Sequence, residues 1–434
     1  MKFEKIFYVI ISTVIITAFI LIGYVSSPLS NRQNSSVKKL YFVDNISSAH
    51  QKIIDLFNKK YAGQIEVEAI NTPFDKFSTN ERKELIARYL RSNSDRIDIF
   101  AVDQIWVPRF AKWSVPLDKF IDSVNRRNLL SYALQSCIYN GSLVAIPLYI
   151  DISMLYYRSD ILATLPNHNI IQKKLNESIT WEDFIKLHKE SGNSQNPFYT
   201  FPGDDYEGFI CLFAEMMASL GKPIAEKDKL YIDSPEAEKC LKLLVAMVNE
   251  YGMAPKDVVR FRESSANNYY VEKNGIFLRD WSSFDKIPDK NRLIDKNLIG
   301  KVPPPHFKDG KKVSVFGGWN LMISKYSTKV PEAITFLNFI MQKDVQKILY
   351  EEGNFLPINN LLYDDSVFTG KHTELKYFKQ MFTLGYHRPF LENYTTISDI
   401  LSYYLNLALR QKMPVKEALI KANSKIEAER ITIK

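Results

Sequence analysis

Cysteine is scarce in this chain, with three residues in 434. Cys137, Cys211 and Cys240 lie far apart and form no CxxC pair, so neither a zinc site nor a disulfide framework is indicated. Cys211 and Cys240 fall in helix-like apolar patterns, where we expect buried free thiols. A single disulfide stays open as an alternative if the chain is exported.

Histidine patterns and blocks of one charge are missing as well. The six histidines show no HxxxH or HxH spacing, which argues against a protein-built metal site, and we expect no cofactor. The 57 basic and 49 acidic residues are mixed along the chain, so the net charge of +8 indicates a solvated surface and no nucleic-acid partner. The length is enough for two or three globular domains.

The first 30 residues predict export. Lys2 and Lys5 precede a mostly apolar run, Phe7–Val25, which is long for a signal-peptide core and just long enough to span a bilayer. The leading positive charges place the start of the chain in the cytoplasm and the rest outside it. Residues 1–30 are therefore a cleaved signal peptide or a retained anchor, and the sequence leaves both open.

Strands and helices alternate in the next part of the chain. Strand patterns at Lys39–Val43, Gln64–Ile70 and Ile97–Ala101 are separated by helical ones, which predicts a parallel α/β sheet. Ligands in such sheets lie beyond the carboxyl ends of the strands. Asp103 and Trp106 occupy that position after the third strand.

The segment after Gly141 places a lone carboxylate between two strand-like runs. Leu143–Ile146 and Met154–Tyr157 flank Asp151, and their link is too short for a parallel pair in one sheet. Either the runs form a hairpin with a solvated Asp151, or the chain leaves one sheet and enters another. In the second case, the carboxylate would suit a ligand held between two lobes.

Six phrases in order resemble the extracellular solute-binding proteins of ABC importers, in the carbohydrate-binding group that includes maltose-binding protein. The resemblance covers nearly everything after residue 38. The phrases are DIFAVDQIWVPRFAKWSVPLDKF (Asp98–Phe120), LVAIPLYIDISMLYYRSDIL (Leu143–Leu162), TWEDFIKL (Thr180–Leu187), DSPEAEKCLKLL (Asp233–Leu244), FGGWNLMISKYSTKVPEAITFLNFI (Phe316–Ile340) and FLPINN (Phe355–Asn360).

The resemblance implies a periplasmic-binding-protein-like α/β fold, preceded here by the N-terminal hydrophobic helix. Two α/β lobes would be joined by a three-segment hinge and close on a ligand. Lobe one would comprise residues 38–150 plus 304–342, and lobe two residues 152–302 plus 345–434. The crossings would fall near Tyr149–Ser153, Lys301–His306 and Gln342–Leu349.

A sugar site needs aromatic platforms and charged hydrogen-bonding groups, because sugars present both hydroxyls and apolar C–H faces. Asp151 matches a carboxylate that binds sugar hydroxyls in relatives; the alternative is a structural hinge residue. Paired glycines let a backbone approach a ligand closely. The candidate ligand-binding residues are Asp103, Trp106, Asp151, Glu207, Trp281, Gly317, Gly318 and Trp319. The alternatives are core packing or a tight turn for the tryptophans and a helix-dipole partner for Glu207.

The function implied is that of an exported, non-enzymatic and monomeric receptor. It would deliver an oligosaccharide or glycoside to an ABC permease. No GxxxxGK[ST] loop occurs in the sequence, so the ATPase would be a separate chain. Two alternatives stay open: a receptor for a polyamine, peptide or phosphorylated polyol, and a secreted carbohydrate-active enzyme, since carboxylates beside tryptophans also line glycosidase clefts.

Overall fold

The computed structural model describes residues 37–73, 76–77, 79–191, 196–226, 229–284 and 295–433. The apolar run 7–25, expected to form an N-terminal helix, lies outside these residues. Among the helices of the described ranges, none has the length and apolar character needed to cross a membrane. The three cysteines are free and buried, as expected for Cys211 and Cys240.

The parallel sheet predicted at the start of the chain is confirmed. Strand β1 (Lys38–Asp44) pairs in parallel with both β2 (Ile65–Asn71) and β3 (Ile99–Asp103). Helix α2 (Ser48–Lys60) begins at the N-cap Ser47, whose side chain accepts from a backbone N–H of the first turn. Its apolar stripe packs into the buried core, as helical spacing requires.

The segment around Asp151 is one continuous strand, β6 (Ile146–Arg158). It pairs with β12 (Ser314–Ile323) up to Ile152, and with β10 (Phe277–Trp281) from Ser153 onward. The hairpin interpretation is therefore wrong, and so is the division into two strands. A register shift in the β12 pairing leaves an extra residue between Pro147 and Tyr149, so this bulge accommodates the proline.

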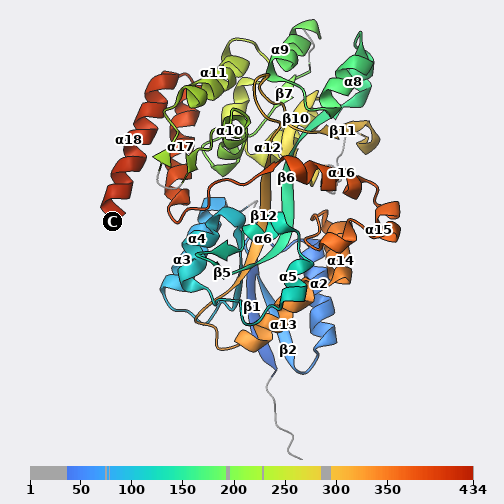
Figure 1. Cartoon of the computed structure of the whole chain (residues 1–434), viewed down its shortest axis with the longest axis vertical. Coiled ribbons are helices and arrows are strands. Elements are labelled where there is room, and N and C mark those ends of the chain that lie inside the picture. Colours follow the sequence, from blue (N-terminus) through green and yellow to red (C-terminus); the bar gives the residue numbers. More distant parts are fainter. Residues whose placement is uncertain are drawn as a thin grey trace, which may run out of the picture.

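In the described part of the chain, nine strands form one sheet with the order β2-β1-β3-β12-β6-β10-β7, in which β11 pairs with β6 and β13 with β12, while β4–β5 and β8–β9 form two separate two-stranded sheets. Strands β6 and β12 pass from one half of the molecule to the other (Figure 1). The remaining strands are β4 (Ile138–Tyr139), β5 (Ser142–Leu143), β7 (Tyr199–Thr200), β8 (Ala225–Glu226), β9 (Lys229–Leu230), β11 (Ile299–Val302) and β13 (Gly385–Tyr386).

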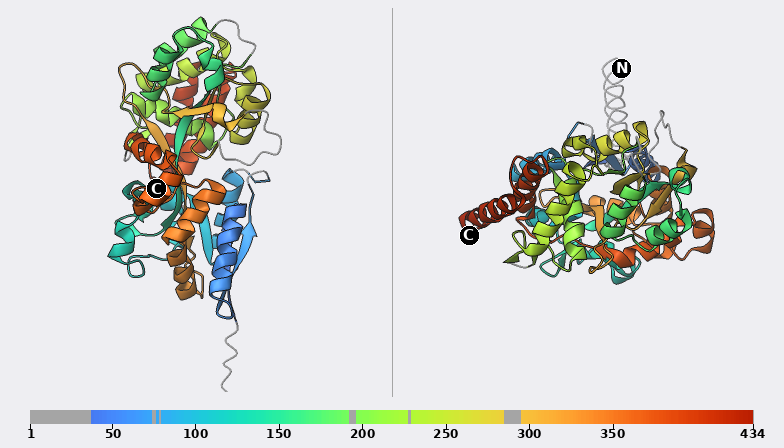
Figure 2. Two further views of the ribbon diagram at one scale, coloured as in Figure 1. Left: turned by 90° about the vertical axis from the view of Figure 1, so that its right-hand side faces the viewer. Right: turned by 90° about the horizontal axis from the view of Figure 1, so that it is seen from above.

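Helices surround the sheet in both halves, which meet at a narrower waist (Figure 2). Besides α2, the α-helices are α3 (Thr79–Arg91), α4 (Val107–Phe110), α5 (Ser123–Arg127), α6 (Ser131–Gln135), α7 (Ser159–Ala163), α8 (His168–Asn176), α9 (Trp181–Glu190), α10 (Glu207–Ser219), α11 (Pro235–Asn249), α12 (Glu263–Glu272), α13 (Val330–Ile340), α14 (Lys343–Gly353), α15 (Ser366–Lys371), α16 (Glu374–Met381), α17 (Tyr394–Leu409) and α18 (Val415–Ile433). The 3₁₀ turns are η1 (Gln104–Trp106), η2 (Ala111–Trp113), η3 (Lys256–Arg260), η5 (Lys296–Leu298), η6 (Asn360–Leu362) and η7 (Phe382–Leu384).

Two contacts bear on where the chain passes between the two halves. The Lys311 backbone N–H donates to the Ser219 carbonyl at 2.7 Å, which ties the segment before β12 to the second half of the molecule. Helix α14 packs against α2, and the Gln346 side chain donates to the Leu148 carbonyl at 3.3 Å. We therefore propose that the second crossing lies within β12 and the third after α14.

Candidate functional site

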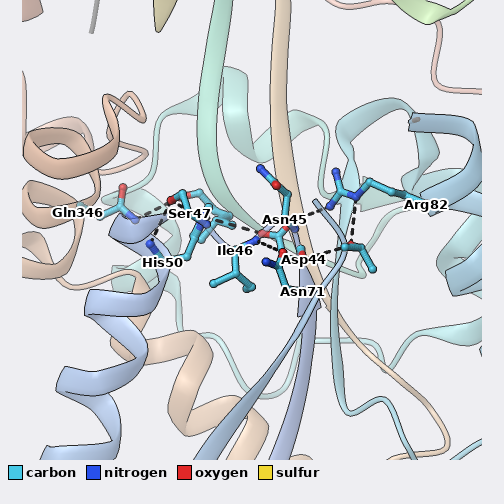
Figure 3. Close-up of polar contacts among 10 residues, drawn as sticks. Asp44, Asn45, Ile46, Ser47, His50, Asn71, Arg82 and Gln346 are labelled. Atoms are coloured by element: carbon cyan, nitrogen blue, oxygen red, sulfur yellow. Dashed lines mark hydrogen bonds and ion pairs between the residues drawn. The ribbon is translucent and has the colours of Figure 1, made fainter. Parts of the chain in front are cut away.

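Polar side chains gather at the carboxyl ends of the first parallel strands. Asp44 ends β1, and its Oδ1 accepts from Nη2 of Arg82 at 2.9 Å (Figure 3). Nε of the same guanidinium donates to Thr72 at 3.2 Å. The guanidinium also lies over the Trp319 ring, 4.3 Å from its centroid. Since Asp44 and Arg82 are both buried, this pair fixes one edge of the site beside Trp319.

His50 lies next to this ion pair. Its Nδ1 accepts from the Ser47 backbone N–H at 3.2 Å within the capping box of α2 (Figure 3). Its Nε2 faces Asp44 Oδ2 at 3.9 Å, and neither atom has a hydrogen-bond partner among the described residues. Burial lowers the pKa of His50, which favours the neutral ring. A ligand hydroxyl could satisfy both atoms at once.

Tyr149 is influenced by both the missed Asp44 and the predicted carboxylates. Its ring packs against Phe355 with centroids 4.4 Å apart. Burial raises the pKa of the Tyr149 hydroxyl, and the negative charges of Asp44, Asp151 and Asp103 act in the same direction. The charges of two carboxylates predicted from sequence and of one that was missed therefore act on the same hydroxyl.

Two predicted residues, Asp103 and Glu207, are joined by an arginine that sequence reasoning missed. Nη2 of Arg388 lies 3.3 Å from Asp103 at the end of β3, and its Nη1 donates to Glu207 at the start of α10. Glu207 also accepts from the hydroxyls of Tyr394 and Ser398. Burial raises the pKa of both carboxyls, and the Arg388 charge opposes that rise.

Asp151 lies where β6 passes from one half to the other. Its Oδ1 accepts from the backbone N–H of Ile152 at 2.8 Å and of Ser282 at 3.0 Å, and from the Ser282 hydroxyl. Asn354, the residue after α14, donates to the Ser282 carbonyl at 3.3 Å. Burial raises the pKa of Asp151 to about 6 despite these donors. The carboxylate thus holds the second-half Ser282 against the crossing strand.

The paired glycines of β12 admit large neighbours. A Cβ on Gly317 would lie 2.6 Å from the Trp281 ring, and one on Gly318 2.6 Å from the Tyr149 carbonyl oxygen. Gly318 has φ +132°, which also disfavours a side chain. The close neighbours here are Trp281 and β6, and the expected close approach to a ligand stays a prediction.

The tryptophans differ in exposure. Trp319 is 8% exposed and meets the edge of Trp106 with ring centroids 5.7 Å apart. Trp106 itself is 2% exposed, so its expected stacking role stays a prediction. Trp281 is partly exposed and carries the Arg279 guanidinium 4.9 Å from its ring centroid.

The missed residues left weak signals in the sequence. Asp44 follows the first strand in the same way that Asp103 follows the third, so the strand-end rule could have found it. His50 and Arg82 sit inside helical patterns, where polar residues are usually solvated. Arg388 is 285 residues from Asp103 in sequence, and no local pattern connects them.

A sheet shared by two α/β halves, with charged and aromatic side chains gathered at the crossing, defines a two-lobed ligand-binding protein. The family described as bacterial extracellular solute-binding protein matches residues 43–347. The chain belongs to this family, as the resemblance implied.

Known proteins resemble most of this chain in sequence or in structure. A probable ABC transporter-binding protein from Deinococcus radiodurans is 24% identical over 346 residues, covering 79% of this chain and 82% of that protein. Maltose-bound MalE3 of T. maritima is 25% identical, with a TM-score of 0.80 over 90% of this chain and 99% of that one. A solute-binding protein from Thermotoga lettingae bound with α-D-tagatose is 20% identical, with a TM-score of 0.78 over 90% and 98% of the two chains.

Proposed function

We propose that this protein is the exported receptor of an ABC importer and captures a sugar between its two lobes. The observation that carries the proposal is the gathering of buried charged groups and indole rings at the ends of the parallel strands, where Asp44 pairs with Arg82 over Trp319 and Asp103 pairs with Arg388. Hydroxyl-binding carboxylates and nearby indole rings suit a sugar. The maltose and tagatose bound by the structural relatives support this class of solute.

The charge balance favours a sugar over a polyamine. Arg82 neutralises Asp44, and Arg388 lies between Asp103 and Glu207. A site for a multiply charged cation would leave its carboxylates free of such partners. The receptor role further implies a permease partner with a separate ATPase chain, a monomer, and no catalysis. Residues 7–25 would be removed on export or retained as a tether.

Calorimetric titration with maltose, maltotriose, tagatose and mannitol tests the proposal. We expect at least one of these to bind with one ligand per chain, and to be recovered unchanged after prolonged incubation. Binding of spermidine or of peptides in place of every sugar would contradict the proposal. Release of hydrolysis products would favour the enzyme alternative, and two ligands per chain would contradict a site between lobes.

Replacing Asp151 by Asn should weaken sugar binding while leaving the fold intact. Loss of charge-assisted hydrogen bonds from the carboxylate is expected to reduce affinity about tenfold or more. At pH 7.5 the folded protein should be no less stable than the wild type, because the raised pKa means that the native state disfavours an ionised Asp151. Titration and urea unfolding measure the two effects.

The contribution of Asp151 to the stability of the folded protein should fall as the pH rises. The pKa of Asp151 is about 6 in the folded protein, against an ordinary 3.8, so the folded state holds the extra proton between these values. In the wild type, the contribution of Asp151 to the free energy of unfolding falls by about 2–3 kcal/mol as the pH rises from 4 to 7. The Asp151→Asn variant should not show this pH-dependent loss. Asp160→Asn is the matched control: Arg158 lowers the pKa of Asp160, so its stabilisation is present at neutral pH and lost on acidification. Identical pH profiles for both variants would contradict this account.

A further inference from the structure

One stripe of helix α10 carries three polar residues into the interior. Glu207, Cys211 and Glu215 follow each other at intervals of four residues, and all three are buried. Arg388 interacts with the first two, and Arg279 of β10 with the last two. Two buried guanidinium groups therefore lie along the same helix face, on either side of Cys211.

Arg279 is buried without hydrogen bonds. The residue is 1% exposed, and its Nε, Nη1 and Nη2 have no hydrogen-bond partner within the described part of the chain. The nearest carboxylate oxygen, Oε2 of Glu215, is 3.8 Å away, which is too far for a hydrogen bond. That oxygen accepts instead from the Ser153 hydroxyl and, at 3.3 Å, from the Val315 backbone N–H.

Two further buried donors also lack acceptors. Tyr199 pairs with Phe277 in the parallel β7–β10 ladder, and so shares the sheet face of Arg279. Its buried hydroxyl and Nε of Arg388 have no hydrogen-bond partner in the described ranges. Both oxygens of Glu207 are occupied by Arg388, Tyr394 and Ser398. Unpaired buried donors are costly, so an added acceptor at any of these groups would be favourable.

We propose that Arg279 binds an anionic oxygen group of the transported solute, so that the solute is an acidic sugar carrying a carboxylate or a phosphate. This inference rests on the proposed function and names the substrate class of the same receptor. A guanidinium fork matches both oxygens of a carboxylate or phosphate, and an aromatic ring beside it suits the sugar body. Trp281, whose partly exposed ring packs on the Arg279 guanidinium, is that aromatic ring.

Glu215 leaves the Arg279 donors available. Its carboxylate is held by Ser153 and Val315 at the lobe crossing, and burial raises its pKa. Protonation of Glu215 would release the Arg279 charge for an incoming anion. On the other face of β10, burial raises the pKa of Asp280 to about 8, so that carboxyl is a weak competitor at neutral pH.

Titration of the full-length wild type with matched pairs tests the proposal. The probes are glucuronate and glucose 6-phosphate against glucose, and digalacturonate against galactobiose, with acetate and inorganic phosphate as free-anion controls. We expect at least one acidic sugar to bind about tenfold or more tightly than its neutral partner. The carboxylate and phosphate pairs identify which anion is preferred. Neutral sugars binding as well as every acidic one would overturn the proposal and leave the sugar receptor standing.

Substitutions of Arg279 test whether this residue causes the preference for acidic over neutral sugars. Arg279→Met should remove it, Arg279→Lys should retain part of it, and the exposed Arg410→Met in the same half should leave it unchanged. Circular dichroism and thermal unfolding establish that each variant is folded. If Arg279→Met does not fold, Tyr199→Phe provides the second test, with a smaller loss of preference expected. A folded Arg279→Met that keeps the full preference would overturn the proposal.

Discussion

Replacing Arg388 by Met should destabilise the protein by about 3–5 kcal/mol, the largest effect expected of any single substitution considered for this chain. Arg388 is 1% exposed and serves two carboxylates, Asp103 from the first half and Glu207 from the second. Its removal takes away the ion-pair partner of both buried acids. Urea unfolding at pH 7.5 measures the loss, and Arg91→Met, which breaks an exposed ion pair with Glu84, should cost less than about 0.5 kcal/mol.

Lowering the pH or adding a second substitution should reduce the destabilisation caused by Arg388→Met. Burial already raises the pKa of Asp103 and Glu207, and removing Arg388 raises both further. The folded variant then takes up protons more readily than the unfolded chain, so the deficit should shrink as pH falls from 8 to 5. Arg388→Met combined with Glu207→Gln should recover part of the stability. A loss below about 1 kcal/mol that does not change with pH would contradict the buried pairing.

Replacing Gly318 by Ala should cost about 2–4 kcal/mol and weaken ligand binding. The residue has φ +132°, and the new Cβ would lie 2.6 Å from the Tyr149 carbonyl oxygen and 3.1 Å from the Ile150 Cα. Both obstacles are backbone atoms of a paired strand, which cannot move without disturbing the sheet. Since Trp319 is the next residue, the shift should also displace this ring. Urea unfolding and titration of the best sugar measure both effects.

Gly370→Ala is the matched control for this prediction. Gly370 lies in helix α15, and nothing lies within 4 Å of the position that its Cβ would occupy. Alanine is the better helix former, so this variant should be neutral or slightly stabilised. Equal unfolding free energies for Gly318→Ala and Gly370→Ala would show that the close approach between β12 and β6 is not a constraint.

Local patterns were enough to predict the first sheet and part of the site. Alternation with helical spacing located β1, β2 and β3, and the rule about strand ends led to Asp103. The paired glycines were predicted to approach a ligand closely; in the structure they lie close to Trp281 and β6, and their role toward a ligand stays a prediction. These features depend on neighbouring residues, so a single sequence contains their signal.

The remaining features depend on contacts between distant parts of the chain. Pro147 and Asp151 divided β6 into two apparent strands, because the bulge that accommodates the proline is visible only once β12 is paired beside it. Helix α14 packs on α2, and the contact between Lys52 and Glu352 joins residues that are 300 positions apart in the sequence. Arg388 was missed for the same reason.

The account locates the ligand at the crossing of β6 and β12, and hydrogen exchange of backbone amides with and without the tightest-binding sugar tests this location most directly. Protection is predicted at residues 44–50, 103–106, 149–153, 281–282 and 316–319, on both sides of the crossing. A separate surface cavity of about 370 Å³ is lined by residues that include Asp160, Ile161 and Phe198. Protection confined to that cavity, with none at the crossing, would contradict the account.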